Sequence, residues 1–208
     1  MIIAFEGGEG SGKGTQIKLL KKVLIAKNVK VLDIVEPGST KVGKAIRKIL
    51  LDRKDLKLTP TAEAMLFSAD RNQEAETVTR PALAEGKVIL SDRSYFSTYA
   101  YQGYGRDLPM RSLELLTLIA VGYTIPDLVI LLDVPPEVGL ARKKRQNKMN
   151  KLDTETVAFH RRVRNGYLEL SKTPGPIWRV VDATASVEET HRQVVEHVFY
   201  VLWRLNLS

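Results

Sequence analysis

The chain has 208 residues, of which 44% are hydrophobic and 27% charged, and its formal net charge is +8. This composition is typical of globular domains and excludes a disordered or fibrous protein. The absence of cysteine excludes disulfides, zinc–thiolate sites, iron–sulfur clusters and cysteine nucleophiles. The longest aliphatic run, Leu128–Leu132, is far shorter than the ~20 residues of a membrane span, and residues 1–6 lack the basic start of a signal peptide. We expect one domain over residues 1–208, a cytoplasmic location and no membrane partner.

Short apolar runs alternate with patterns of helical period along the chain. The expected elements, in chain order, are a strand at 2–5, a helix at 15–27, a strand at 29–35, helices at 41–51 and 60–84, strands at 88–90, 128–132 and 178–181, and a helix at 186–203. Thr59-Pro60 is typical of a helix cap followed by a first-turn proline. We expect the apolar faces of the first and last helices to be buried, namely Ile17, Leu20 and Leu24 in the first and Val187, Val194, Val198 and Val201 in the last.

The order of these elements predicts the fold class. Strands separated by helices indicate βαβ units with right-handed crossovers, and hence a parallel arrangement. Short aliphatic strands without polar alternation indicate a sheet that is covered on both faces. The prediction is therefore an α/β fold with a five-stranded, mostly parallel sheet and helices on both faces. Ligands of such sheets bind at the carboxyl ends of the strands, so the residues that follow each strand are the candidates for chemistry.

The first strand ends in a glycine-rich loop that leads directly into a helix. Four residues separate Gly7 from Gly12-Lys13, which is the spacing of a P-loop. Such glycines let backbone N–H groups surround phosphate oxygens, while the lysine reaches the β- and γ-phosphates. We therefore expect ATP to bind through Gly7, Gly8, Glu9, Gly10, Ser11, Gly12, Lys13, Gly14 and Thr15.

The residue after the P-loop lysine departs from the strict pattern, which has serine or threonine there to hold Mg²⁺. This chain has Gly14, and the hydroxyl follows at Thr15. We expect Mg²⁺ to accompany ATP and to be held by Thr15 and Asp92, directly or through water. The loop ending Gly-Lys-Gly-Thr-Gln resembles that of nucleoside monophosphate kinases, and no Asn-Lys-x-Asp tetrapeptide of the GTPases follows a later strand.

Three further segments lie beyond the P-loop. Glu36-Pro37-Gly38 follows the second strand, Phe67 and Arg71 lie one helical turn apart, and a segment from Asp92 to Arg106 follows the third strand. In this order the segments resemble the bacterial-type thymidylate (dTMP) kinases over nearly the whole chain. The resemblance implies the three-layer fold of the P-loop nucleoside monophosphate kinases with a short lid. It also implies transfer of the γ-phosphoryl group of ATP to dTMP, giving ADP and dTDP in dTTP synthesis.

The resemblance implies an acceptor site made of Glu9, Glu36, Pro37, Phe67, Arg71, Arg93, Thr98, Tyr101 and Gln102. Phe67 would stack on the thymine, and Arg71 and Arg93 would bind the dTMP phosphate. An aromatic ring beside a guanidinium suits a nucleotide in any case, with the base on the ring and phosphate in the fork.

The same resemblance gives finer roles around the nucleoside. Thr98 and Gln102 would face the thymine, and Glu9 would lie at the 3′-hydroxyl of dTMP. Tyr101 would lie beneath the sugar C2′ and crowd a ribose hydroxyl.

A basic stretch over residues 142–153 is the expected lid. The resemblance implies that Lys13, Arg93 and Arg142 are catalytic and that lid closure excludes water. The family's Asp-Arg-x-Glu pattern aligns with residues 150–153, where Lys151 replaces an arginine. Because lysine cannot form a bidentate fork, the choice between Arg142 and Arg145 as the catalytic lid residue stays open.

Two other functions stay open at this point. Gly14 also fits another nucleoside monophosphate kinase, such as one for AMP, although Tyr101-Gln102-Gly103 argues against it. The basic stretches at 41–54 and 142–151 would suit a non-catalytic nucleic-acid-binding protein, but no separate nucleic-acid motif accompanies them. The resemblance implies ATP and dTMP as partners, no nucleic acid, and a homodimer.

Overall fold

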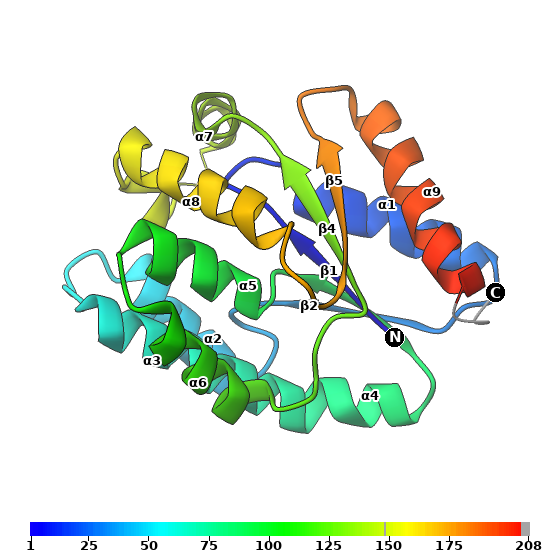
Figure 1. Ribbon diagram of the computed structural model, residues 1–208, viewed down its shortest axis with the longest axis horizontal. Helices are drawn as coiled ribbons and strands as arrows, with labels where there is room; N and C mark the ends of the chain where they lie inside the picture. Colours follow the sequence, from blue (N-terminus) through cyan, green and yellow to red (C-terminus); the bar gives the residue numbers. More distant parts are fainter. Residues whose placement is uncertain (148, 205–208) are drawn as a thin grey trace.

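The structure is built on a five-stranded parallel sheet. In the computed structural model, which describes residues 1–147 and 149–204, the strand order is β2-β3-β1-β4-β5 (Figure 1), and each neighbouring pair is parallel. The strands are β1 (Ile2–Glu6), β2 (Val31–Val35), β3 (Val88–Asp92), β4 (Leu128–Asp133) and β5 (Ile177–Asp182). All five predicted strands are confirmed, with ends that differ by one or two residues.

Nine α-helices lie in the described ranges: α1 (Lys13–Ala26), α2 (Lys41–Arg47), α3 (Pro60–Glu74), α4 (Arg80–Ala84), α5 (Tyr95–Thr98), α6 (Met110–Val121), α7 (Pro136–Arg145), α8 (Val157–Leu170) and α9 (Val187–Arg204). π-helical turns η1 (Lys48–Asp52), η2 (Ala75–Thr79) and η3 (Tyr99–Gly105) extend α2, α3 and α5, and η4 (Leu152–Thr154) is a 3₁₀ turn. The helices predicted at 41–51 and 60–84 are thus present, each interrupted by a π turn. The Thr59 hydroxyl caps α3 by accepting from the Ala62 N–H at 3.3 Å, and none of the described helices could cross a membrane.

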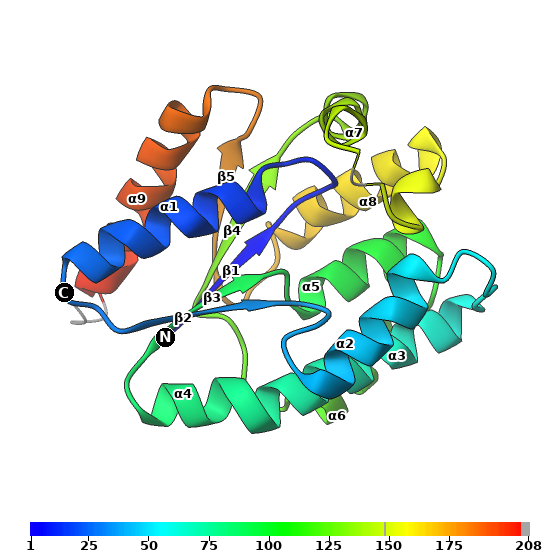
Figure 2. The ribbon, with the colours of Figure 1, turned by 180° about the vertical axis from the view of Figure 1, so that it is seen from behind.

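Helices cover both faces of the sheet, so the structure has three layers. Helices α1 and α9 lie side by side on one face (Figure 2), where Ile3 and Phe5 of β1 point into their shared core. Ala4 points to the opposite face, where α2, α3, η3 and α8 pack. This alternation along a strand that is buried on both sides confirms the covered parallel sheet.

The burial of the first and last helices is as expected with one exception. Ile17, Leu20 and Leu24 are buried in α1, and Val194, Val198 and Val201 in α9. The expected burial of Val187 is wrong, because its side chain is 47% exposed in the first turn of α9. Its backbone carbonyl, not its side chain, makes the inward contact, by accepting from Gln16 Nε2 at 3.0 Å.

The strand order determines where a ligand can bind. Strand β1 lies between β3 and β4, and the connection from β1 to β2 runs in the opposite direction to that from β3 to β4. In parallel α/β sheets, the carboxyl ends beside such a switch point form a binding crevice. The P-loop follows β1 at this point, and Arg93 follows β3 beside it.

Candidate active site

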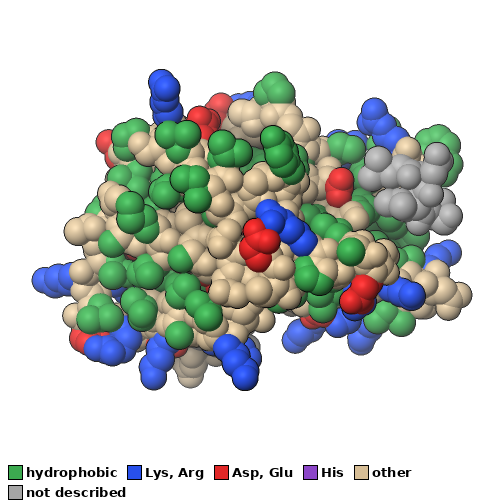
Figure 3. Space-filling model, turned by 90° about the horizontal axis from the view of Figure 1, so that it is seen from below, with side chains coloured by type: hydrophobic (Ala, Val, Ile, Leu, Met, Phe, Trp, Pro, Cys, Tyr) green, Lys and Arg blue, Asp and Glu red, His purple; other side chains and the backbone are tan. Residues whose placement is uncertain are grey.

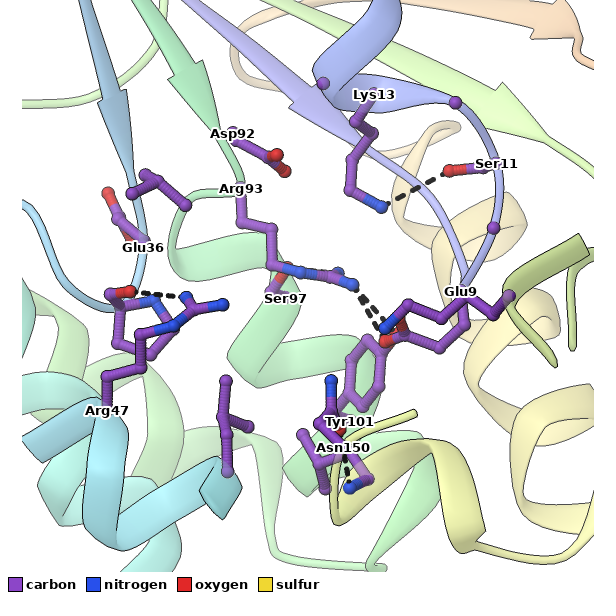
Figure 4. Close-up of a pocket in the computed structure, with 18 of the residues that line it drawn as sticks. Glu9, Ser11, Lys13, Glu36, Arg47, Asp92, Arg93, Ser97, Tyr101 and Asn150 are labelled. Carbon is purple, nitrogen blue, oxygen red and sulfur yellow. Dashed lines mark hydrogen bonds and ion pairs between the residues drawn. The ribbon is translucent and has the colours of Figure 1, made fainter. Parts of the chain in front are cut away.

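A cavity of about 380 Å³ opens at the carboxyl ends of β1, β2 and β3 (Figure 4). The predicted site residues that line it are Glu9, Gly10, Ser11, Gly12, Lys13, Gly14, Thr15, Glu36, Pro37, Phe67, Arg71, Asp92, Arg93, Tyr101 and Gln102. Gly7, Gly8, Thr98 and Arg142 are the predicted residues that do not line it. The structure therefore brings the proposed donor and acceptor residues into one continuous space.

Lys13 lies at the floor of the donor half. Its Nζ donates to the carbonyls of Gly7 at 3.0 Å and Gly8 at 3.1 Å and to Ser11 Oγ at 3.2 Å. The ammonium group is thus folded over the loop where phosphates would lie. Burial, together with the charge of Arg93, lowers the pKa of Lys13 to about 8. Phosphate oxygens would favour the charged form and counteract this shift.

The P-loop is in backbone contact with α7, the helix that leads into the predicted lid. A Cβ added at Gly10 would lie 2.0 Å from the carbonyl oxygen of Gly139, and one added at Gly139 would lie 2.0 Å from the carbonyl oxygen of Glu9. Gly10 also has a φ of +67°, a conformation that side-chain-bearing residues rarely adopt. Only glycine therefore allows this close approach at both positions.

Glu9 is the meeting point of the two halves. Its carboxylate accepts from Arg93 Nη2 at 2.9 Å and from the Tyr101 hydroxyl at 2.8 Å, and Lys143 Nζ lies 3.1 Å from it. Burial alone would raise the pKa of Glu9, but the cations Arg93, Lys143 and Lys13 outweigh it and hold the pKa well below its usual range. Glu9 therefore forms ion pairs with Arg93 and Lys143 between the P-loop and the residues proposed to bind the acceptor.

Arg93 reaches across the cavity to the P-loop. Its Nη1 donates to the Gly7 carbonyl, Ser97 Oγ and the Tyr167 hydroxyl, each at 3.2 Å. Its guanidinium carbon lies 5.1 Å from the centre of the Tyr101 ring. These contacts hold a cation opposite Lys13, where charge would accumulate between two nucleotides.

A buried carboxylate fixes the loop that carries Arg93. Glu6 has no exposed surface and accepts from the Ser94 N–H at 2.7 Å, Ser94 Oγ at 2.8 Å, Ser97 Oγ at 2.7 Å and the Tyr167 hydroxyl at 2.8 Å. Because these donors satisfy the charge, Glu6 ties the end of β1 to the loop after β3. Its role is to hold Arg93 in place.

The acceptor half is built on one face of α3. The Arg71 guanidinium carbon lies 5.8 Å from the centre of the Phe67 ring, which confirms that the two side chains share a helix face. Arg71 Nε donates to Glu36 Oε2 at 2.5 Å, and its Nη1 donates to Thr98 Oγ1. Thr98 thus lies behind Arg71 and supports it. Burial raises the pKa of Glu36 to about 8, against the attraction of Arg71.

The loop after β2 is held from two sides. Arg47 Nη1 donates to the Pro37 carbonyl at 2.7 Å, and the Gly38 N–H donates to Asp70 Oδ1 at 3.1 Å. The Glu36–Pro37 peptide bond is cis. The loop therefore presents Glu36 and Pro37 to the cavity from a fixed backbone.

Comparison with known proteins agrees with this geometry. The thymidylate kinase family profile matches residues 5–194. A thymidylate kinase from Kosmotoga olearia is 42% identical over 99% of this chain and 98% of its own length. Those from Nitratidesulfovibrio vulgaris and Acholeplasma laidlawii are 46% and 40% identical over 94% and 95% of this chain, and over 90% and 98% of their own lengths. The chain belongs to the thymidylate kinase family.

In this member of the thymidylate kinase family, the basic side chains expected to act from the predicted lid do not point into the cavity. Arg142 Nη1 donates to the Ala183 carbonyl at 2.8 Å, beyond β5, and Arg145 is exposed. Lys151 Nζ donates to the Leu56 carbonyl at 2.6 Å. Lys143, which the sequence did not single out, lines the cavity instead. Residue 148 of the predicted lid lies outside the described residues.

The residues near the P-loop of this thymidylate kinase family member fit a magnesium ion that is carried by a nucleotide. Asp92 and Thr15 line the cavity, and Asp92 Oδ2 would lie 3.9 Å from a Cβ added at Gly14. Their carboxylate and hydroxyl are hard oxygen donors of the kind that Mg²⁺ prefers. The described residues hold no group of three or more acids or histidines that could cage a metal alone. The donor set therefore suits an ion that takes its other ligands from phosphates and water.

Proposed function

We propose that this protein transfers the γ-phosphoryl group of ATP to dTMP, giving ADP and dTDP for dTTP synthesis. The observation that carries the proposal is the convergence of Lys13 and Arg93 on the P-loop from opposite sides of one cavity. The second pKa of a phosphate monoester is about 6, so the dTMP phosphate is its own nucleophile and needs no general base. The task of the protein is to bring two polyanions together and to stabilise the charge that develops between them.

On the donor side, the loop from Gly7 to Thr15 would cradle the ATP phosphates. Lys13 would leave its carbonyl partners for the β- and γ-phosphates. Mg²⁺ would be held by Thr15 and Asp92, directly or through water, and would neutralise charge on the phosphates when bound. Arg142, against the carbonyl after β5, would belong to this donor side.

On the acceptor side, Phe67 would stack on the base, and Arg71 would bind dTMP from the same helix face. Arg93 lies nearer the P-loop and would contact the acceptor phosphate at the point of transfer. Tyr101, which is held by Glu9, would lie under the sugar. Pro37 and Glu36 would close the site from the β2 side.

The lid contribution comes from Lys143. It is the basic side chain of α7 that faces Glu9, and Asp153 orients it with bonds of 2.9 and 2.7 Å. Asp153 Oδ2 also accepts from the Asn150 N–H at 2.6 Å, which fixes the turn that carries it. Closure of residues 142–153 would exclude water and suppress hydrolysis of ATP.

We further propose that the chain is one domain that forms homodimers in the cytoplasm. Hydrophobic side chains gather on the face of α3 and α6 that lies away from the sheet (Figure 3). Ile119 is 78% and Tyr123 96% exposed, and Met65, Leu115 and Leu118 are also exposed. A face that exposes several large apolar side chains is typical of an interaction site. Sedimentation of the wild type and of Ile119→Asp would test the dimer, because the charge should yield a monomer.

The function is tested by ADP release with a panel of acceptors: dTMP, dUMP, AMP, CMP and GMP. dTMP should give the highest kcat/KM, and omission of Mg²⁺ should abolish turnover. A preference for AMP would favour the other kinase class. If ADP were released at the same rate with every acceptor and also without any acceptor, the protein would be an ATPase.

A further inference from the structure

The side-chain amide of Gln102 is held in one orientation. Gln102 lies in η3 and lines the cavity, and its Nε2 donates to Glu63 Oε1 at 2.8 Å. Both side chains are buried, with 1% and 4% exposure. A carboxylate has no hydrogen to donate, so the atom that faces it must be the amide NH₂ group. The carbonyl oxygen of Gln102 therefore points away from Glu63.

Glu63 is itself kept as an acceptor. Arg106 donates to it through Nε at 3.3 Å and Nη2 at 3.2 Å, and Arg106 Nη2 also lies 2.7 Å from Glu155. Arg106 in turn lies over the ring of Phe159, 4.7 Å from its centre. Arg106 thus donates to both carboxylate oxygens of Glu63, and a carboxylate can only accept hydrogen bonds.

The carbonyl oxygen of Gln102 is an unmet acceptor. No donor from residues 1–147 or 149–204 reaches it. In the described part of the chain, the fully buried side-chain atoms without a hydrogen-bond partner are His160 Nε2 and Trp178 Nε1. The Gln102 oxygen is not among them, so it keeps some access to solvent. Since Gln102 lines the cavity, its free oxygen is available to a ligand there.

The surroundings show which part of a ligand meets this oxygen. Glu63, Phe67 and Arg71 follow one another at four-residue spacing, so they form one stripe along α3. Arg71 uses Nε and Nη1 for Glu36 and Thr98, which leaves Nη2 for a ligand within the described part of the chain. A flat base on Phe67 would thus meet an acceptor from Gln102, while Nη2 of Arg71 would serve the dTMP phosphate.

We infer that Glu63 is a positioning residue that makes the acceptor site select pyrimidines with an N–H at ring position 3. It acts by fixing Gln102 with its oxygen toward the base. Thymine and uracil offer that N–H beside carbonyl oxygens, whereas the N3 of cytosine is an acceptor and would face the Gln102 oxygen unpaired. The inference rests on the proposed function, since it names how the same acceptor site reads its base.

The test is Glu63→Leu. Glutamine could keep its oxygen at the position that accepts from both Gln102 and Arg106 Nε, whereas leucine offers no acceptor to the Gln102 NH₂ group. Gln102 can then turn at no cost and present NH₂ to the base. The ratio of kcat/KM for dTMP to that for dCMP should fall by about 10- to 100-fold. The ratio for dUMP to dTMP should stay at the wild-type value, because both carry the same N3–H.

Two further variants complete the design. Glu155→Gln disturbs the same ion pairs without touching Gln102, so it should leave the dTMP to dCMP ratio unchanged. Gln102→Leu removes the amide and should lower that ratio even if Glu63→Leu fails to fold. Folding is checked by circular dichroism and by the KM for ATP.

Three outcomes would overturn the inference: an unchanged ratio in a folded Glu63→Leu variant, an equal loss for dTMP and dCMP, or an unchanged ratio in Gln102→Leu. Failure of the proposed function would look different, because the wild type itself would then not phosphorylate dTMP. In that case, calorimetric binding of dTMP and dCMP to the same variants replaces turnover as the readout, and an unaltered preference would again contradict the role of Glu63.

Discussion

The ammonium of Lys143 lies 3.1 Å from the carboxylate of Glu9. This contact joins α7 to the P-loop residue that Arg93 and Tyr101 also bind. Three elements far apart in the sequence therefore place polar groups on one buried carboxylate. A cation held there is within reach of phosphates that enter the cavity from either side.

Lys143→Ala should lower kcat by roughly 100- to 1000-fold, the usual cost of removing one group that stabilises transition-state charge. The KM values for both nucleotides should change less, because the cation acts mainly on transferred charge. Lys144→Ala is the matched control, since its neighbouring side chain is exposed. Steady-state kinetics of both variants give the comparison. Near wild-type turnover in Lys143→Ala would remove Lys143 from the mechanism.

Binding of ATP should take up a proton above pH 8. Burial and Arg93 lower the pKa of Lys13 to about 8 in the free protein, and phosphate oxygens favour the charged lysine. At pH 8.5 most of the free lysine is neutral, so uptake should be roughly 0.8 proton per ATP, and it should fall to about 0.1 at pH 7. Calorimetry in buffers of different ionisation enthalpy measures this. Lys13→Met should abolish the uptake; an unchanged value would assign the proton to another group.

Arg71→Ala should damage the acceptor side selectively. Loss of a buried charge-assisted contact should cost on the order of 2–4 kcal/mol, which is roughly 30- to 1000-fold in kcat/KM for dTMP. ATP binding to the free enzyme should change little, because ATP lies across the cavity. Arg71→Lys restores the charge without the fork and should recover activity in part. Separate titrations of ATP and dTMP decide, and equal losses for the two nucleotides would contradict the acceptor assignment.

Tyr101→Ala should raise activity on ribothymidine monophosphate relative to dTMP. The Tyr101 ring is 3% exposed and fixed by Glu9, so a ribose hydroxyl against it would lose its solvation at a cost of roughly 1–3 kcal/mol. Tyr101→Phe keeps the ring and should keep the discrimination. The measurement is the ratio of kcat/KM for the two substrates. If the ratio is the same in all three proteins, the ring does not exclude ribose.

Tyr167→Phe should destabilise the fold. It removes one of the hydrogen bonds to the fully buried carboxylate of Glu6, which should cost about 1–3 kcal/mol. The Tm should fall by roughly 2–4 °C for each kcal/mol in a chain of this length. Tyr200→Phe, at a half-exposed position of α9, serves as the control. Equal melting temperatures would show that the remaining donors satisfy Glu6.

The parts of the site that could be predicted are those set by short-range spacing. The P-loop follows a strand and precedes a helix, and Phe67 and Arg71 share a face by helical geometry alone. The predicted ends of the strands lie within two residues of the observed ends. Local patterns are informative there because the chemistry lies directly after each element.

The lid could not be read in the same way. Its basic residues carry no apolar period that indicates which side chain turns inward. The contact of α7 with the P-loop decides this, and it sends Lys143 toward Glu9 and Arg142 toward Ala183. Glu63 was missed for a related reason: an acid in the first turn of a helix is usually explained by the helix dipole.

The backbone contact between Gly10 and Gly139 determines where the lid can pivot. A side chain at either glycine would collide with the backbone of the other segment, so the start of α7 is fixed against the P-loop. If residues 142–153 close and open as proposed, the chain must bend after Gly139, and the loop proposed to hold the ATP phosphates would keep its shape during that movement.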